Sequence, residues 1–202
     1  MTPRNTNGNS GKNPKDTVAA TTEDMPPADL YIDRMSASQA LAAMLANQAH
    51  AITALEAALP AIDAAADAAY QRLSTSDNGR LIYVGAGTSA RIGVQDGAEL
   101  PPTFNWPQHR IGFVIAGGEA ALLRAVENAE DSAETACTHI ADMGVAQNDV
   151  VIGLAASGST VFTTAALAAA EQAGAVTIGV ANNPDTALLD NVSYPILLAT
   201  GA

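Results

Sequence analysis

Two hydroxyl-rich turns follow apolar runs in this chain, and both are suited to binding an anion. The first is Gly85-Ala-Gly-Thr-Ser-Ala90, directly after the run Leu81 to Val84, and the second is Ala156-Ser-Gly-Ser-Thr160, after 150–155. Glycine allows the backbone to approach a ligand closely, and free N–H groups at the start of a helix favour a phosphate. Seven residues are therefore expected to bind the phosphate of a small molecule: Gly87, Thr88, Ser89, Ser157, Gly158, Ser159 and Thr160.

Other functions of these turns are less well supported. The first turn fits a relaxed dinucleotide fingerprint, but the acidic residue expected about 20 positions on is absent, and the first acid after the next apolar run is Glu119. The turns are not P-loops, because no lysine occurs after Lys15. Ser157, Ser159 and Thr160 could instead serve as ordinary helix N-caps. Arg91 is the one cation next to either turn in the sequence.

Two glutamates near the first turn could act as general acid and base. Glu99 ends the helix expected after this turn, and Glu130 ends the one expected after the second strand. On residue type alone, both fit solvated helix positions better than catalytic ones. The three histidines are scattered without ligand spacing, so the sequence indicates no structural metal site.

Composition restricts the partners and the setting. The net charge is −12, which argues against nucleic acids and anionic membranes as partners. The single cysteine, Cys137, excludes an intrachain disulfide and fits a reducing cytoplasm. No apolar run approaches the roughly 20 residues that a membrane-spanning helix needs.

The chain divides into three parts. Residues 1–28 are expected to form a disordered tail, and 29–78 a helical hairpin that begins with a capping box at Ser36 and is interrupted at Pro60. From 79 to 202, apolar runs alternate with helical patterns, which predicts an α/β domain: a five-stranded parallel sheet between two layers of helices. The expected strands are 81–84, 111–116, 149–155, 175–181 and 194–199. The expected helices are 89–98, 119–129, 132–142, 160–173 and 185–190.

Five ordered motifs resemble N-acetylmuramic acid 6-phosphate etherases, whose core is a sugar isomerase (SIS) domain. They are Gly85-Ala-Gly-Thr-Ser-Ala-Arg91, Ala98-Glu-Leu-Pro-Pro-Thr-Phe104, Ile115-Ala-Gly-Gly-Glu119, Ala125-Val-Glu-Asn-Ala-Glu-Asp131 and Ala155-Ala-Ser-Gly-Ser-Thr160. The resemblance runs from about Gly79 to Gly201, and the longer family sequence continues beyond that point.

The resemblance implies a function and an assembly. The family removes D-lactate from N-acetylmuramic acid 6-phosphate during cell-wall recycling, with no cofactor or metal. Glu99 matches the family's proton donor and Glu130 its second catalytic glutamate, and the hydroxyl turns match the sites that bind the sugar 6-phosphate. SIS proteins commonly complete their active sites with a second subunit, so a homodimer is expected.

Departures from the family pattern leave alternatives open. Ser159 stands where the family usually has arginine, and the segment that would bring further positive charge is missing after Ala202. The chain alone is therefore expected to fold but to be a poor catalyst. A non-catalytic sugar-phosphate sensor is the main alternative, and a phosphosugar isomerase is a third.

Overall fold

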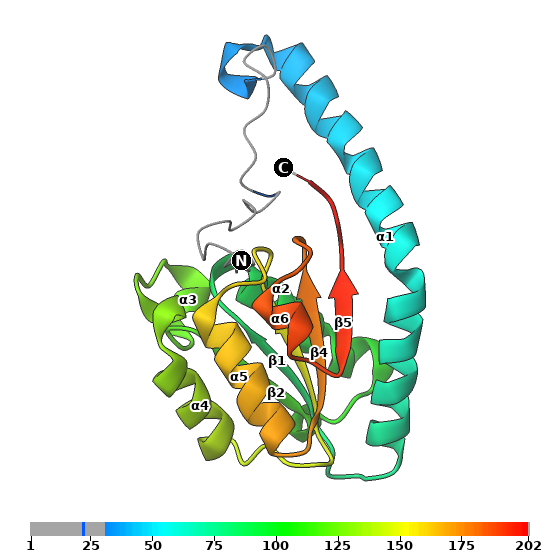
Figure 1. Cartoon of the computed structure of the whole chain (residues 1–202), viewed down its shortest axis with the longest axis vertical. Coiled ribbons are helices and arrows are strands. Elements are labelled where there is room, and N and C mark those ends of the chain that lie inside the picture. The colour runs from blue at the N-terminus through cyan, green and yellow to red at the C-terminus, as the bar shows by residue number, and fades with distance from the viewer. Residues whose placement is uncertain (1–21, 23–30, 202) are drawn as a thin grey trace, which may run out of the picture.

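The molecule is built around one parallel β-sheet flanked by helices, as seen in a computed structural model that describes Thr22 and residues 31–201 (Figure 1). The predicted tail 1–28 thus lies, apart from Thr22, outside the described residues. All strands pair in parallel, in the order β2-β1-β3-β4-β5. The predicted five-stranded parallel α/β sheet is confirmed. The strands are β1 (Leu81–Gly85), β2 (Ile111–Ile115), β3 (Val150–Leu154), β4 (Val176–Ala181) and β5 (Tyr194–Leu197).

Two helical layers cover the sheet, because its strands alternate apolar side chains between the two faces. Ile82, Val84 and Val151 pack on one face with Phe162 and Leu167. The opposite face is covered by α1 toward β4 and β5, and by α2 over β1 and β2. The helices are α1 (Ala37–Ser74), α2 (Gly87–Phe104), α3 (Ala120–Leu123), α4 (Ala133–Asp142), α5 (Val161–Gln172) and α6 (Ala187–Asp190).

The predicted helical hairpin is wrong, because α1 is one helix of 38 residues that runs through Pro60. Proline removes one backbone hydrogen bond and bends a helix, but it ends a helix only where the flanking residues also favour a turn. Here Leu55, Leu59 and Ile62 continue the apolar spacing across the proline, with no glycine or polar turn. The capping box at Ser36 is confirmed, since its hydroxyl accepts from the Gln39 N–H.

The region after β2 also differs from the expectation. Instead of a helix over 119–129, α3 ends at Leu123, and the chain continues as an irregular segment to the 3₁₀ turn Ala129–Asp131. Asn128 has φ of 59°, in the left-handed region that interrupts a helix. This segment folds back over the end of β1 rather than extending into solvent as a helix.

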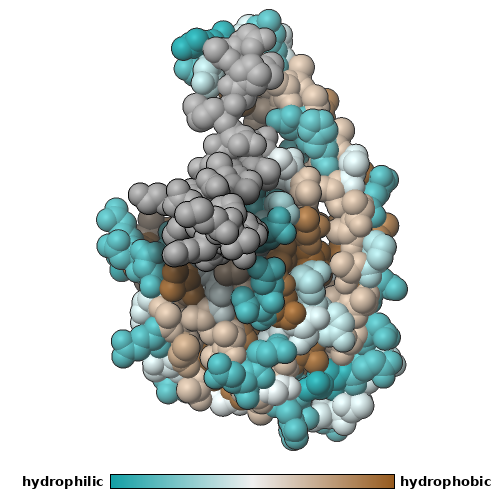
Figure 2. All heavy atoms as spheres, in the orientation of Figure 1, coloured by the Kyte–Doolittle hydropathy of each residue, from teal (hydrophilic) through white to brown (hydrophobic). Residues whose placement is uncertain are grey.

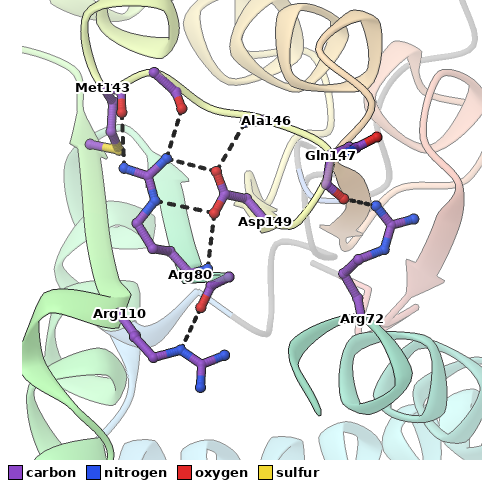
Figure 3. A network of polar contacts seen from close by, with 9 residues as sticks. Arg72, Arg80, Arg110, Met143, Ala146, Gln147 and Asp149 are labelled. Atoms are coloured by element: carbon purple, nitrogen blue, oxygen red, sulfur yellow. Dashed lines mark hydrogen bonds and ion pairs between the residues drawn. The ribbon is translucent and has the colours of Figure 1, made fainter. Parts of the chain in front are cut away.

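Arginines tie α1 and β1 to the loops at the amino ends of the strands (Figure 3). Arg80 forms an ion pair with Asp149, at 2.7 Å between Nη2 and Oδ2, and donates to the carbonyl oxygens of Met143 and Gly144. Asp149 also accepts from the backbone N–H groups of Ala146 and Arg80. The pair therefore joins the start of β1 to the start of β3.

A second arginine, Arg110, closes the connection between α1 and the sheet. It is buried and donates to the carbonyl oxygens of Gly79, Leu73 and Ser76. Leu73 lies in the last turn of α1, where carbonyl oxygens lack partners within the helix and a cation is favourable. The guanidinium also lies over the ring of Trp106, 4.5 Å from its centroid.

We expect Asp149→Asn to destabilise the fold by about 3 kcal/mol at neutral pH, because it leaves Arg80 without its counter-charge. Burial raises the pKa of Asp149, but the hydrogen bonds from Arg80 and two backbone N–H groups outweigh it and hold the pKa below its ordinary value. A carboxyl with a lowered folded pKa stabilises the fold above its unfolded pKa, and this contribution is lost as pH falls through the folded value. The difference between wild type and variant should therefore shrink on acidification below about pH 4.

Urea denaturation across this pH range measures the effect. Asp77→Asn is the matched control, since Asp77 is exposed and should change the free energy of unfolding by no more than about 0.5 kcal/mol. An equal loss in both variants would contradict a special role for Asp149.

Candidate functional site

The two hydroxyl turns lie next to each other at the carboxyl edge of the sheet. The reason is the pairing of β1 with β3, in which Gly85 and Leu154, the last residues of the two strands, are register partners. Adjacent strands are about 4.8 Å apart, so the segments that follow them begin side by side. The chain also reverses its direction across the sheet here, since β1 connects to β2 on one side and β3 lies on the other. Open α/β sheets bind ligands at such a switch point.

The first turn leaves backbone N–H groups available. Gly87 has φ of 53° and begins α2, and the N-cap residue Ala86 has no side chain that could accept from them. Thr88 is exposed and Ser89 half-buried. The start of α2 can therefore donate to an anion from its backbone and from two hydroxyls.

The second turn presents its hydroxyls in the same way. Thr160 is the N-cap of α5, but its side chain makes no capping hydrogen bond. Ser157 accepts from the Ser159 N–H at 3.2 Å, which curls the turn around the end of β3. Thr160 therefore does not serve as a simple N-cap through its side chain, whereas Ser157 does accept from a local backbone N–H.

Asn183, which the sequence analysis did not identify, anchors the second turn through a hydrogen bond to its backbone. Its side chain is buried and donates to the Ser157 carbonyl oxygen at 3.2 Å. The same side chain accepts from the Thr22 N–H at 3.1 Å and donates to the Thr22 hydroxyl at 2.9 Å. The neighbouring Asn182 donates to Leu198 and Thr200 beyond β5. The sequence feature that could have indicated this role is Asn182-Asn183-Pro184, a turn-forming segment directly after β4.

A cavity of about 220 Å³ opens beside the first turn, between the end of β1 and the segment after α3. Gly87 and Thr88 line it from the turn, and Glu130 lines it from the 3₁₀ turn Ala129–Asp131. Arg91, Arg124 and Glu127 complete its charged wall. The structure thus brings Glu130 to the predicted phosphate turn. Ser89 and the residues of the second turn are not among those that line this cavity.

Glu99 lies elsewhere. It is exposed on α2, 12 residues after Gly87, which corresponds to about 18 Å along the helix axis. It does not line the cavity that contains Glu130. Within this chain, the two predicted catalytic carboxylates therefore do not line the same cavity.

Arg91 is present at the turn, as the sequence indicates, but its guanidinium is engaged. Nε donates to the Leu122 carbonyl oxygen at 3.1 Å, and Nη2 to that of Ala121 at 3.0 Å. These bonds fix α3 against α2. Arg124, which the sequence places far from either turn, is the second cation of the cavity wall.

Other features do not suggest a competing site. A larger hollow of about 770 Å³ beside the outer edge of β2 is lined mainly by apolar side chains and contains no paired carboxylates. Among the residues that the structure describes, no three His, Cys, Asp or Glu side chains cluster as metal ligands. No helix in the described ranges has the length and apolarity to span a membrane.

Comparisons with known proteins identify a matching family model and related sequences. A family model described as the glucokinase regulatory protein N-terminal SIS domain matches residues 65–171. The N-acetylmuramic acid 6-phosphate etherase of Deinococcus radiodurans is 43% identical over 89% of this chain and 58% of its own length. The etherase of Pasteurella multocida is 41% identical over 84% of this chain and 56% of its length. The resemblance to this family is confirmed, and the chain spans a little over half of these relatives.

The fold has solved counterparts. A phosphoheptose isomerase from Francisella tularensis superimposes with a TM-score of 0.65, covering 81% of this chain and 86% of that one. Its sequence is 19% identical, so the likeness concerns the fold alone.

We expect Gly158→Ala to destabilise the protein more than Gly118→Ala. Both glycines have positive φ, 70° and 67°, so each substitution costs about 1 kcal/mol in backbone strain. A Cβ at 158 would also lie 2.4 Å from the Thr186 hydroxyl, whereas one at 118 meets no atom within 4 Å. Overpacking should add about 1–3 kcal/mol at 158 only. Chemical denaturation of both variants measures the difference, and equal losses would show that Thr186 does not confine the second turn.

Proposed function

This chain belongs to the SIS domain family, and we propose that it forms the sugar-phosphate-binding part of an N-acetylmuramic acid 6-phosphate etherase. The reaction releases D-lactate and leaves N-acetylglucosamine 6-phosphate. The main observation in support is the position of Glu130, in a cavity that begins at the first hydroxyl turn. A phosphate held at the two turns would place the attached sugar at this cavity.

The chemistry suits two carboxylates. In the open-chain sugar, the C2 proton lies next to the aldehyde and is acidic, and a carboxylate acting as base removes it. A carboxylic acid gives a proton to the lactyl ether oxygen as its bond to C3 breaks, which yields lactate and an unsaturated aldehyde. Water then adds at C3. We assign Glu99 as the acid and Glu130 as the base that also activates water.

Phosphate recognition in this proposal rests on neutral donors. Ser89, Ser157 and Thr160 supply hydroxyls, and the starts of α2 and α5 supply backbone N–H groups and the positive ends of their helix dipoles. Thr88, Ser159, Gly87 and Gly158 complete the two turns. Sugar phosphates are metabolites of the cytoplasm, and the exposed, unpaired Cys137 suits that compartment, so we propose a cytoplasmic location.

The proposed active unit is a homodimer. Half of α1 extends beyond the sheet in Figure 1, and Figure 2 shows tan and brown residues along it. Five large apolar side chains of α1 are about half exposed or more, and successive members lie three, four or seven residues apart. This spacing places them in one stripe along the helix, made of Leu41, Leu45, Ile52, Leu55 and Leu59. Such spacing is that of a helix that packs against another helix. A second copy would cover this stripe and could also bring its Glu99 toward Glu130.

We expect Glu99→Gln and Glu130→Gln each to lower lactate release by about 10²–10⁴-fold in the full-length protein, because each removes a proton transfer. If the two glutamates of one site come from different subunits, mixing the inactive variants restores activity. Random exchange makes half of the dimers mixed, each with one intact site, so about a quarter of wild-type activity should return. Lactate is measured with D-lactate dehydrogenase.

Glu134→Gln is the matched control and should change lactate release little, since Glu134 is exposed on α4 and does not line the cavity. Recovery of no activity on mixing, with subunit exchange verified, would contradict a site shared between subunits. Sugar-phosphate binding without lactate release by the wild type would favour the sensor and overturn the etherase proposal.

The double substitution Leu45→Glu and Ile52→Glu should convert the dimer to a monomer, because it places charges in an apolar interface. Sedimentation velocity measures the change in mass. Asn47→Glu is the control, since Asn47 lies on the same exposed half of α1 but off the stripe. A wild-type protein that sediments as a monomer would overturn the dimer.

A further inference from the structure

The charged residues of the cavity beside the first turn include one cation with no internal partner. The described part of the chain contains six arginines, and five of them are engaged. Arg72, Arg80, Arg91 and Arg110 donate to carbonyl or carboxylate oxygens, and Arg34 lies over the ring of Tyr31. Among these six described arginines, only Arg124 has a side chain that makes no hydrogen bond, ion pair or ring contact.

Arg124 is held at the cavity by its backbone rather than by its side chain. Its N–H donates to the Ala120 carbonyl oxygen at 3.3 Å, which closes α3. The Arg91 guanidinium donates to the carbonyl oxygens of Ala121 and Leu122 in the same short helix. The backbone before Arg124 is therefore fixed, while its guanidinium remains exposed at the wall of the cavity.

The other charges of the wall are unfavourable for an anion. Glu127 and Glu130 line the same cavity, and the whole chain carries a net charge of −12. An anionic group that enters this space needs a cation close by to offset this repulsion. Arginine binds carboxylates through two parallel N–H···O hydrogen bonds, which gives both affinity and orientation.

We propose that Arg124 binds the carboxylate of the lactyl ether, and so selects an acidic sugar ether over the neutral sugar phosphate. This inference rests on the proposed function, in which the substrate carries two anionic groups. The phosphate is assigned to the two hydroxyl turns, which leaves the carboxylate for the cavity. Its carbon is joined through one carbon atom to the ether oxygen that departs. A fixed carboxylate therefore fixes the leaving group beside Glu130.

Binding of two sugars distinguishes this role from phosphate binding. Isothermal titration of the chain measures the dissociation constants of N-acetylmuramic acid 6-phosphate and N-acetylglucosamine 6-phosphate, which differ only in the lactyl group. Arg124→Gln should weaken the first by about tenfold or more, the usual effect of losing a charged hydrogen-bond pair, and the second by less than about twofold. Arg124→Lys should fall between wild type and Arg124→Gln for the first ligand. Arg34→Gln, an exposed arginine away from the cavity, is the control.

The outcomes separate the two proposals. Equal weakening of both sugars by Arg124→Gln would mean that Arg124 binds the phosphate, and no weakening of either would mean that it contacts neither; each overturns this inference and leaves the proposed function standing. Failure of the wild type to bind either sugar would overturn the proposed function, and this inference with it. Circular dichroism verifies that the variants retain the fold.

Discussion

The pairing of β1 with β3 is the constraint on which the candidate site depends. Because both strands run in parallel and end in register at Gly85 and Leu154, two segments nearly 70 residues apart in the sequence begin side by side. Neither turn alone offers more than the start of one helix. Together they place two helix starts and several hydroxyls next to each other at the carboxyl edge of the sheet, and a shift of register would move them apart. The buried apolar side chains that fix β1 and β3 between the helical layers are thus also what positions the site.

Contacts at the amino ends of the strands also stabilise the pairing of β1 with β3. Arg80 and Asp149 join the first residues of the same two strands, and Arg110 joins the end of α1 to the loop that enters β1. Most of the arginines that the structure describes donate hydrogen bonds to carbonyl or carboxylate oxygens in this way. The site edge is consequently poor in free positive charge, and the proposed phosphate site therefore uses hydroxyls and backbone N–H groups.

Local pattern predicted the sheet well, since each strand is a short apolar run bounded by turn residues. It predicted the two turns for the same reason, because glycine and hydroxyl residues at a strand end act locally. The local pattern gave wrong helix boundaries where packing against distant parts of the chain determines them. Pro60 suggested a break, but the apolar stripe on both sides of it belongs to one helix that rests on the sheet. The acids and Ala-rich run after Glu119 suggested a helix, but Asn128 adopts a left-handed conformation there. Arg124 and Asn183 were not identified, because their positions beside the two turns follow from the fold: Gly87 and Thr88 share the cavity of Arg124, and Ser157, 26 residues before Asn183, accepts its hydrogen bond.

The length of α1 has a mechanical consequence. The side chains of Ala54 and Ala58 are buried, and Ala58 already belongs to the core cluster on the sheet. The portion from Ala37 to Thr53, about 25 Å long, therefore acts as a lever arm anchored at one end. Pro60, inside the anchored part, lacks one of the hydrogen bonds that stiffen a helix. A bend of about 10° at the base of the arm displaces the far tip by about 4 Å, given the arm's length. Whatever packs on the exposed stripe therefore also fixes the angle of the arm, and small changes at its base are amplified at its tip.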